Sequence, residues 1–427
     1  MYLDNPLIIS ILIGFTTILL NMITKGHCLY NSLIMNVLSK LPNMSQCRKN
    51  FLSEVFVLLL SIKGRINFLQ LFRYGKHCEQ RYRQQFEKPF DFLEFNKSLT
   101  LSSGGGRYAI AFDPSYINKS GKKTPGLGYF WSGCAGKAKW GLEIAGLAAI
   151  DIENHTAFHL EAVQTVTDSN KDSTLTDWYA NVISSRKEAL CTISNILVAD
   201  AWFSKKKFVD QIISVGMHLI SRLRDDADLM YLYKGKPTGN KGRPRKYAGK
   251  IDHNNIDENY FSLVKQDEDS TIFYAKVYSK SLKRTIKLLH VVYTNAKGKE
   301  IYKLYFSTDL SIEALDILKY YKARFQIEFL YRDGKQHTGL NDCQARSENK
   351  LHFHFNASLT AINIAKVTHW LSIPKEKRKA FSMSDIKTLN HNSLLLQRFF
   401  DVFAVNPHSA KNKRRVNELL YYGTIAA

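Results

Sequence analysis

Three acidic residues stand where carboxylates can act together on one substrate. Asp113 ends the apolar run RYAIAFD, Asp200 ends the apolar run SNILVAD, and Glu328 lies within a long segment of helical pattern. Carboxylate oxygens at the ends of neighbouring strands can converge on a hard divalent cation. Two such ions about 3.5–4 Å apart can activate an attacking oxygen and stabilise the leaving oxygen of a phosphodiester. Taken singly, each acid could be a helix N-cap or a turn residue, and for a single Asp at the end of a strand that is the better explanation.

The segment around Glu328 adds two cations and a phenol. Residues 311–336 (SIEALDILKYYKARFQIEFLYRDGKQ) are predicted to form one helix. Tyr321, Arg324, Glu328 and Lys335 fall within an arc of about 60° at about 100° per residue. Such a face is suited to holding a phosphate beside metal ions. The alternative is an exposed amphipathic helix in which Arg324 and Glu328 form an ordinary i,i+4 ion pair.

The elements that must position these residues form an α/β pattern. Alternating and β-branched runs predict strands separated by amphipathic helices. The expected order is strand, strand, strand, helix, strand, helix, strand, at residues 107–113, 140–152, 156–166, 175–190, 194–200, 204–215 and 217–223. This order fits an RNase H-like catalytic core, while other three-layer α/β folds remain open.

A β-rich insertion is expected to interrupt this core before the Glu328 helix. It begins with KGKPTGNKGRPRKYAGK (234–250), which has seven basic residues and no acid. Its glycines and prolines predict a flexible loop, and we expect it to contact DNA through its charges, above all those of Lys241, Arg243, Arg245 and Lys246. Strand-like runs follow at residues 271–278, 285–294 and 300–307.

The chain therefore divides into six expected parts. Residues 35–101 have a helical pattern that is equally typical of a small DNA-binding module and of a packing appendage. The full division is an apolar extension (1–34), the helical N-terminal module (35–101), the first part of the core (107–223), the basic loop and β-rich insertion (224–308), the second part of the core with the catalytic helix (309–372) and a basic helical tail (373–427).

The charge balance points to a polyanionic partner. Sixty Lys and Arg against 38 Asp and Glu give a formal net charge of +22. Each phosphate that a cation neutralises releases condensed counterions, so nucleic acid is favoured over anionic lipid or mere solubility. The six cysteines contain no CxxC pair, which argues against a disulfide framework or a zinc site. His352 and His354 are expected to pack after the catalytic helix.

The apolar N-terminal segment is expected to be an extension or a small packed helix. Pro6 to Ile23 is apolar, but the preceding MYLDN carries no positive charge, unlike a secretory signal. The segment is also short for a membrane span. Since Met22 and Met35 are alternative starts, we expect a chain beginning at Met35 to be soluble and active. No stable membrane association is expected, and the location should be cytoplasmic, at the nucleoid.

The sequence YKARFQIEFLYRDGK (321–335) resembles the Y-x2-R-x3-E-x6-K signature of DDE transposases of the insertion-sequence-4 family. STDLS before it, FHFNAS after it, GRPRKY in the basic loop and GLGYFWSGCA after the first Asp are also similar, over roughly residues 50–370. The resemblance implies that Asp113, Asp200 and Glu328 are the catalytic triad and the ligands of magnesium or manganese, as two ions. It implies that Tyr321, Arg324 and Lys335 contact DNA near the cleaved end.

The same resemblance implies a cut-and-paste reaction on double-stranded DNA. Water first releases a 3′-hydroxyl at the element end, and that hydroxyl then attacks the opposite strand or target DNA. The partners would be terminal inverted repeats and target DNA, bound by a dimer. Two alternatives remain: an RNase H-like endonuclease without strand transfer, and a catalytically silent DNA-binding derivative.

The insertion departs from some relatives, which use a Trp there to hold a flipped base while a DNA hairpin forms. No Trp occurs between Trp202 and the end of the insertion. A tyrosine offers an aromatic face for the same stacking, and the candidates are Tyr278, Tyr293, Tyr302 and Tyr305. The hairpin step is left open.

Overall fold

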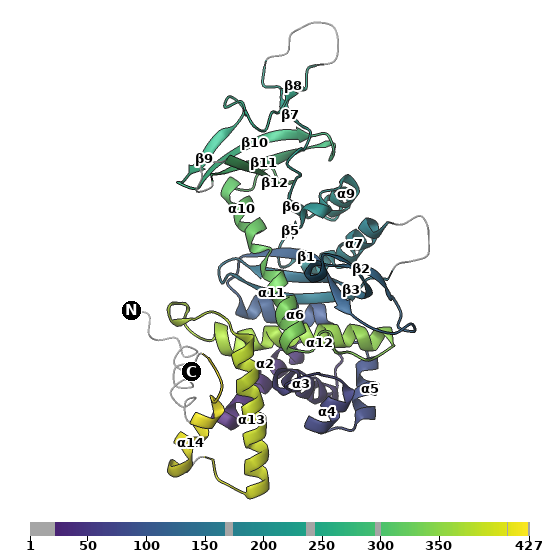
Figure 1. The fold of residues 1–427 in the computed structure, drawn as a ribbon, viewed down its shortest axis with the longest axis vertical. Helices are drawn as coiled ribbons and strands as arrows, with labels where there is room; N and C mark the ends of the chain where they lie inside the picture. The colour runs from purple at the N-terminus through teal and green to yellow at the C-terminus, as the bar shows by residue number, and fades with distance from the viewer. Residues whose placement is uncertain (1–21, 167–173, 236–243, 295–299, 408, 426–427) are drawn as a thin grey trace.

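The computed structural model describes residues 22–166, 174–235, 244–294, 300–407 and 409–425. One mixed sheet runs through the molecule, with the strands of residues 229–307 at one end and a group of helices at the other (Figure 1). Its hydrogen-bonded path is β2-β3-β1-β5-β6-β12-β11-β10-β7-β8, with β4 beside β3 and β9 beside β10. The α/β class predicted from the sequence is confirmed.

The strands nearest Asp113 combine antiparallel and parallel pairing. β1 (Tyr108–Asn118) and β4 (Thr156–Gln164) lie antiparallel on either side of β3 (Lys137–Asp151). On the other side of β1, β5 (Ile196–Ala199) and β6 (His218–Arg222) run parallel to it. β1 continues for five residues beyond Asp113, which corrects the prediction that this strand ends at the acid.

One strand and one helix break were missing from the sequence prediction. β2 (Gly128–Ser132) forms a hairpin with the first residues of β3, whose side chains there are exposed. The helix predicted at 175–190 is divided into α7 (Leu175–Ser184) and α8 (Lys187–Cys191). A capping box between Thr174 and Asp177 fixes the start of α7. α9 (Lys206–Ser214) packs beside α7 through its buried apolar residues.

The strands expected in an insertion extend the same sheet. β12 (Glu300–Ser307) pairs with β6, and β11 (Arg284–Thr294) and β10 (Ser270–Ser279) continue outward. Three shorter strands, which the sequence pattern did not reveal, complete it: β7 (Leu229–Leu232), β8 (Tyr247–Lys250) and β9 (Ser262–Gln266). β8 occupies the last four residues of the predicted loop at 234–250, so that prediction is wrong there.

The helix expected at 311–336 is two helices. α10 (Ala314–Ala323) and α11 (Gln326–His337) are separated by a turn at Arg324 and Phe325. Both turn residues keep right-handed helical dihedral angles, so the axis is interrupted without reversing. The prediction of one continuous helix is therefore wrong, and the interruption falls on Arg324, one of the signature residues.

Helices from both ends of the chain pack together beneath the sheet (Figure 1). The central helix of this group, α3 (Gln46–Ser61), contacts both α12 (Glu348–Lys366) and α13 (Met383–Phe403). Ten of its residues are buried, since it has apolar neighbours on several sides. The other members are α2 (Met22–Ser39), α4 (Phe68–Tyr74), α5 (Glu79–Glu87), α6 (Phe92–Ser103) and α14 (Ala410–Leu420).

The boundary expected at residue 34 falls within α2. Tyr30 and Ile34 are 1% and 0% exposed. The Tyr30 hydroxyl accepts a hydrogen bond from Asn390 of α13 and contacts His369, and Asn31 accepts one from Ser53. Most of the apolar segment from Pro6 to Ile23 lies outside the described residues. No helix in the described part is long and apolar enough to cross a membrane.

Side chains of α12 pair with the open edge of β4. The Asn356 amide donates to the Ala162 carbonyl (2.9 Å) and accepts from the Ala162 N–H (2.7 Å). Asn363 makes the same two contacts with His159, at 2.8 and 2.9 Å. A sheet edge buried without such partners would leave its backbone groups unsatisfied. The two asparagines therefore dock α12 on the strand.

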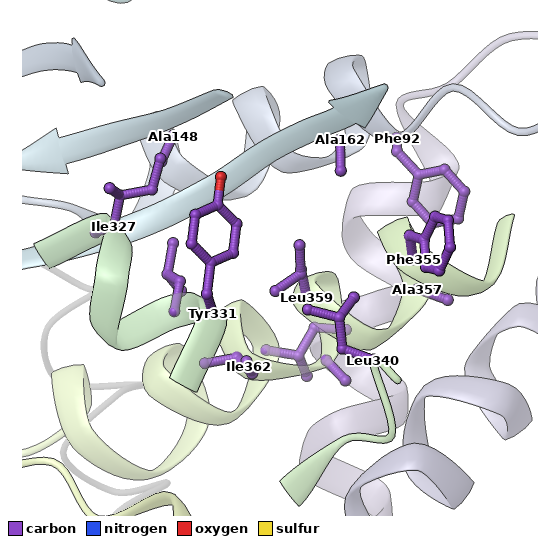
Figure 2. Packing of buried hydrophobic residues seen from close by; sticks show 14 of the residues in the cluster. Phe92, Ala148, Ala162, Ile327, Tyr331, Leu340, Phe355, Ala357, Leu359 and Ile362 are labelled. Atoms are coloured by element: carbon purple, nitrogen blue, oxygen red, sulfur yellow. The ribbon is translucent and has the colours of Figure 1, made fainter. Parts of the chain in front are cut away.

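Apolar packing places α11 against the same strands. Figure 2 shows Ile327 and Tyr331 of α11 beside Ala148 of β3, with Leu359 and Ile362 of α12 in the same cluster. All five residues are at least 94% buried. His354 is buried in the same region, where its Nε2 lies 2.7 Å from the Gly339 carbonyl. The helix that carries Glu328 is thus held by its buried face.

Candidate active site

Strand register brings Asp113 and Asp200 together. β1 and β5 pair in parallel, and their last paired residues are Phe112 and Ala199. Asp113 and Asp200 are the next residues on the two neighbouring strands. Asp200 then leaves the sheet, and its Oδ1 accepts the Ala201 N–H at 2.6 Å.

Glu328 joins them from the first turn of α11, with Arg324 between. Arg324 Nη1 lies 3.6 Å from Asp113 Oδ1, and Nη2 lies 3.3 Å from Glu328 Oε1. The Arg324 side chain is 13% exposed. Its Nε is buried and has no hydrogen-bond partner among the described residues. One guanidinium therefore spans two of the three predicted acids.

The neighbouring carboxylates affect the pKa of Asp113. The pKa of Asp113 is raised to about 7, first by burial and then by the negative charges of Glu328, Asp200 and Glu143, while Arg324 opposes the rise. Glu143 was not identified from the sequence, where it is one acid in an apolar run. It is buried on β3 and accepts hydrogen bonds from Tyr179 (2.5 Å) and Thr165 (2.9 Å).

Two contacts fix α11 to β1 beside the acids. The buried Tyr331 hydroxyl donates to the Asp113 carbonyl at 2.5 Å. Its ring points toward the strands in Figure 2. The close approach needs a glycine opposite, because a Cβ on Gly146 would lie 1.9 Å from the Tyr331 hydroxyl. One turn further along, Lys335 Nζ donates to Ser115 Oγ at 2.9 Å.

Tyr321 completes the group expected on one helix face. It is half-buried against Tyr305 of β12, with ring centroids 5.0 Å apart. Burial raises the pKa of the Tyr321 phenol; the nearby charges of Arg324 and Asp200 lower and raise it, respectively. Tyr321, Arg324, Glu328 and Lys335 therefore stay on the side facing β1 and β5, although the helix is interrupted.

A family model for the transposase DDE domain matches residues 115–364, more than half of the chain. The chain belongs to the transposase DDE domain family. The match begins two residues after Asp113 and spans Asp200 and Glu328. No curated protein matches the chain. The protein is thus a DDE-type transposase, an enzyme class that binds DNA and generally uses divalent metal ions.

The acids of this transposase are suited to such an ion, although they do not form a closed ligand set as they stand. Among the described residues, no three His, Cys, Asp or Glu side chains are grouped closely enough to hold a metal. Arg324 instead supplies the positive charge between Asp113 and Glu328. Besides burial, the negative charges of Glu328 and Asp200 raise the pKa of Asp113, and a bound cation would offset that repulsion. Hard divalent ions prefer such oxygen donors. The donor chemistry therefore fits.

The predicted DNA contacts of the basic loop lie elsewhere. Lys241 and Arg243 fall outside the described residues. Arg245 and Lys246 are exposed just before β8, at the far end of the insertion from β1 (Figure 1). Arg245 lies over the Tyr233 ring at 5.2 Å and donates to the Tyr247 carbonyl. The transposase does not bring Arg245 or Lys246 to the acids, so a contact that either makes would be with a more distant part of the DNA.

Proposed function

We propose that this transposase performs cut-and-paste transposition with Asp113, Asp200 and Glu328 as metal ligands. The observation that carries the proposal is that Arg324 spans Asp113 of β1 and Glu328 of α11, while Asp200 directly follows β5, the strand paired in parallel with β1. A divalent ion bound there would supply the charge that activates the attacking oxygen and stabilises the leaving oxygen. The matching residues 321–335 support a place within the insertion-sequence-4 family.

The strand order supports an RNase H-like core. β4, β3 and β1 form an antiparallel set, and β5 and β6 follow parallel to β1. α7 and α9 contribute to the apolar cluster on one face, and α10 and α11 to the cluster on the other. On this interpretation β7–β12 are an insertion between β6 and α10. The acids would then occupy adjacent core strands and the following helix.

The cationic side chains have separate proposed roles. Arg324 leaves the two carboxylates and contacts a phosphate of the scissile strand, which gives its unpaired Nε a partner. Lys335 stays fixed by Ser115 and contacts a neighbouring phosphate. Tyr321 bounds the same side. Together they orient the phosphodiester for in-line attack, and cleavage by water leaves a 3′-hydroxyl and a 5′-phosphate.

The second chemical step distinguishes this proposal from a simple endonuclease. The 3′-hydroxyl attacks another phosphodiester, so one P–O bond forms as another breaks and no external energy source is needed. We expect the active form on DNA to be a dimer that holds two element ends. Glu143, enclosed by Tyr179 and Thr165, is assigned to shaping the charge near Asp113 rather than to ligation.

The test uses a pre-cleaved duplex taken from the DNA that flanks this reading frame. It is incubated with supercoiled plasmid and magnesium or manganese. We expect plasmid joined covalently to the labelled 3′ end. Nicked plasmid without joined product would indicate an endonuclease instead. The absence of both products would indicate a catalytically silent derivative.

A further inference from the structure

Two polar clefts meet beyond the end of β1. Their volumes are about 310 and 530 Å³, and both are lined by Arg65 and Asp342. The walls come from the α3–α4 loop, the segment after β1 and the segment between α11 and α12. Lys335 and Lys387 also line the second cleft. We call this surface the β1 groove and define it by the six other cations that line the clefts: Lys63, Arg65, Lys119, Lys122, Lys123 and Arg346.

The groove carries an unbalanced positive charge. Five of its six cations, all except Lys119, are exposed and form no ion pair with a described carboxylate. Among the described residues that line the two clefts, Asp342 alone is acidic. Its Oδ2 accepts the Ile66 N–H at 2.8 Å, so this carboxylate is engaged in holding the α3–α4 loop. A surface of this kind attracts a polyanion.

The walls of the groove are tied to one another before any ligand binds. Lys119 Nζ donates to the carbonyls of Cys343 (2.5 Å) and Ala345 (2.9 Å). Gly339 has a φ of +75° and packs tightly, since a Cβ there would lie 2.8 Å from Ile66 Cβ. These contacts join three segments that are distant in the sequence. A site that is already formed loses less conformational entropy on binding.

β1 links the groove to the acids. Alternate residues of a strand share a face, so Asp113, Ser115 and Ile117 lead along one side to Lys119 just beyond the strand. Ser115 accepts from Lys335 on that side, and Lys119 holds the groove wall. Six residues of strand span about 20 Å, at about 3.3 Å per residue. At about 3.4 Å per base pair, this is the length of about six base pairs.

We propose that the β1 groove binds the phosphate backbone of duplex DNA about six base pairs from the phosphodiester at Asp113. This inference rests on the proposed function, because it places the cleaved strand at the acids. Arg65, Lys122 and Arg346 make the contacts, and Lys119 positions the wall. None of the residues that line the two clefts belongs to the strands of residues 229–307, so the groove would be a DNA contact separate from theirs.

The first experiment measures binding without metal. A fluorescent 30-base-pair duplex of arbitrary sequence is titrated with full-length protein in EDTA over a range of salt. The groove variant is Arg65→Gln/Lys122→Gln/Arg346→Gln. The control is Lys411→Gln/Lys413→Gln/Arg415→Gln on α14, which also removes three exposed positive charges. The charge-preserving variant Arg65→Lys/Lys122→Arg/Arg346→Lys reports on folding and on the need for charge.

We expect the groove variant to lose about 0.9 of log-log salt slope for each contact removed, hence up to about 2.7. The control should lose less than about one third of that, and the charge-preserving variant should bind like the wild type. Equal slopes for groove and control variants would overturn the proposal. So would a charge-preserving variant that binds as weakly as the groove variant while melting at the wild-type temperature.

A second arm identifies which DNA occupies the groove. The groove variant is tested on the pre-cleaved flanking duplex and, once bound to it, for capture of an unrelated plasmid. If the variant no longer binds the flanking duplex, the groove holds element-end DNA. If it binds that duplex but no longer captures the plasmid, the groove holds target DNA. The groove proposal and the proposed function can fail separately. If the wild type nicks DNA but the groove and control variants have equal salt slopes, only the groove proposal is wrong. If the slopes of the two variants differ but the wild type does not nick DNA, only the proposed function is wrong.

Discussion

Arg324 lies between Asp113 and Glu328, 3.6 Å from the first carboxylate and 3.3 Å from the second. A cation entering between these acids would compete with the guanidinium for the same oxygens. The guanidinium would then be free to bind a phosphate, which Arg recognises through several fixed N–H groups. One side chain therefore has two successive partners in this account: the acids before the metal binds, and DNA afterwards.

Replacing Arg324 with Ala should lower the rate of cleavage at saturating DNA more than it lowers affinity. An interaction that matters mainly in the transition state has this kinetic signature. We expect a rate loss of at least about 100-fold, as for loss of one charge-stabilising contact. Single-turnover cleavage and equilibrium binding measure the two effects. As a contrast, Lys241, Arg243, Arg245 and Lys246 replaced together by Gln should weaken affinity more than rate. If Arg324→Ala lowered affinity more than rate, Arg324 would not act on the scissile phosphate in the transition state.

The raised pKa of Asp113 predicts a stability that depends on pH. The folded-state pKa is about 7, against the ordinary value of 3.8 for an Asp carboxyl. The folded protein thus holds this proton more tightly, so the contribution to stability is complete below about pH 4 and is lost as pH rises through 7. Without divalent ions, Asp113→Asn should therefore melt above the wild type at pH 8, and the difference should shrink at pH 5.

Calorimetry with and without magnesium tests the same residue as a ligand. Magnesium should raise the melting temperature of the wild type at pH 8 and leave that of Asp113→Asn unchanged, because a ligand stabilises only the protein that binds it. Asp226→Asn is the matched control, since Asp226 is exposed and paired with Arg224. Without magnesium, the difference in melting temperature between the wild type and Asp113→Asn should depend on pH. The same difference at pH 5 and pH 8 would contradict the burial of the Asp113 carboxyl.

The contact between Gly146 and Tyr331 predicts a specific pair of effects. Gly146→Ala should destabilise the protein by about 1–3 kcal/mol, because its Cβ collides with the Tyr331 hydroxyl. Tyr331→Phe removes the colliding oxygen, so the double variant should lose less than the sum of the single changes. Gly133→Ala is the control, since its Cβ meets no atom within 4 Å. If the losses of unfolding free energy of the two single variants simply add in the double variant, the Tyr331 hydroxyl does not lie against Gly146, and α11 is further from β3 than the structure has it.

Truncation to Met35 should destabilise the protein, in contrast to the expectation from sequence. It removes Tyr30 and Ile34 from the core and leaves Asn390 of α13 without its partner. Loss of a buried aromatic side chain costs about 3–5 kcal/mol. The urea midpoint of the truncated chain should therefore fall further than that of Tyr30→Phe, which keeps the ring. Equal urea midpoints for the truncated and full chains would show that residues 1–34 are dispensable for stability, as the sequence led us to expect.

The sequence predicted the elements whose patterns are strong. β3, β4, β10, β11 and β12 are long runs of apolar or alternating residues, and all five were placed correctly within a few residues. β7, β8 and β9 are only four or five residues long, and half-exposed or exposed residues occur in each. Their pairing depends on β10 and on one another, so no local pattern marks them.

The site was predictable in composition but not in geometry. Asp113 and Asp200 follow apolar runs, which marks both acids, but the parallel register that makes them neighbours is a long-range property. The turn at Arg324 contains no Gly or Pro, so nothing local indicates it. Glu143 resembles a chance acid within a strand until its partners on α7 and at Thr165 are known.

The most direct test of the central claim is metal-dependent nicking of supercoiled plasmid by Asp113→Asn, Asp200→Asn and Glu328→Gln. Each change removes a ligand oxygen and keeps the side chain's shape, so DNA binding in EDTA should remain near the wild-type level. The account predicts no nicking by any of the three in magnesium or manganese, and wild-type nicking by Asp226→Asn. Near-normal nicking by any one of the three would remove that residue from the metal site.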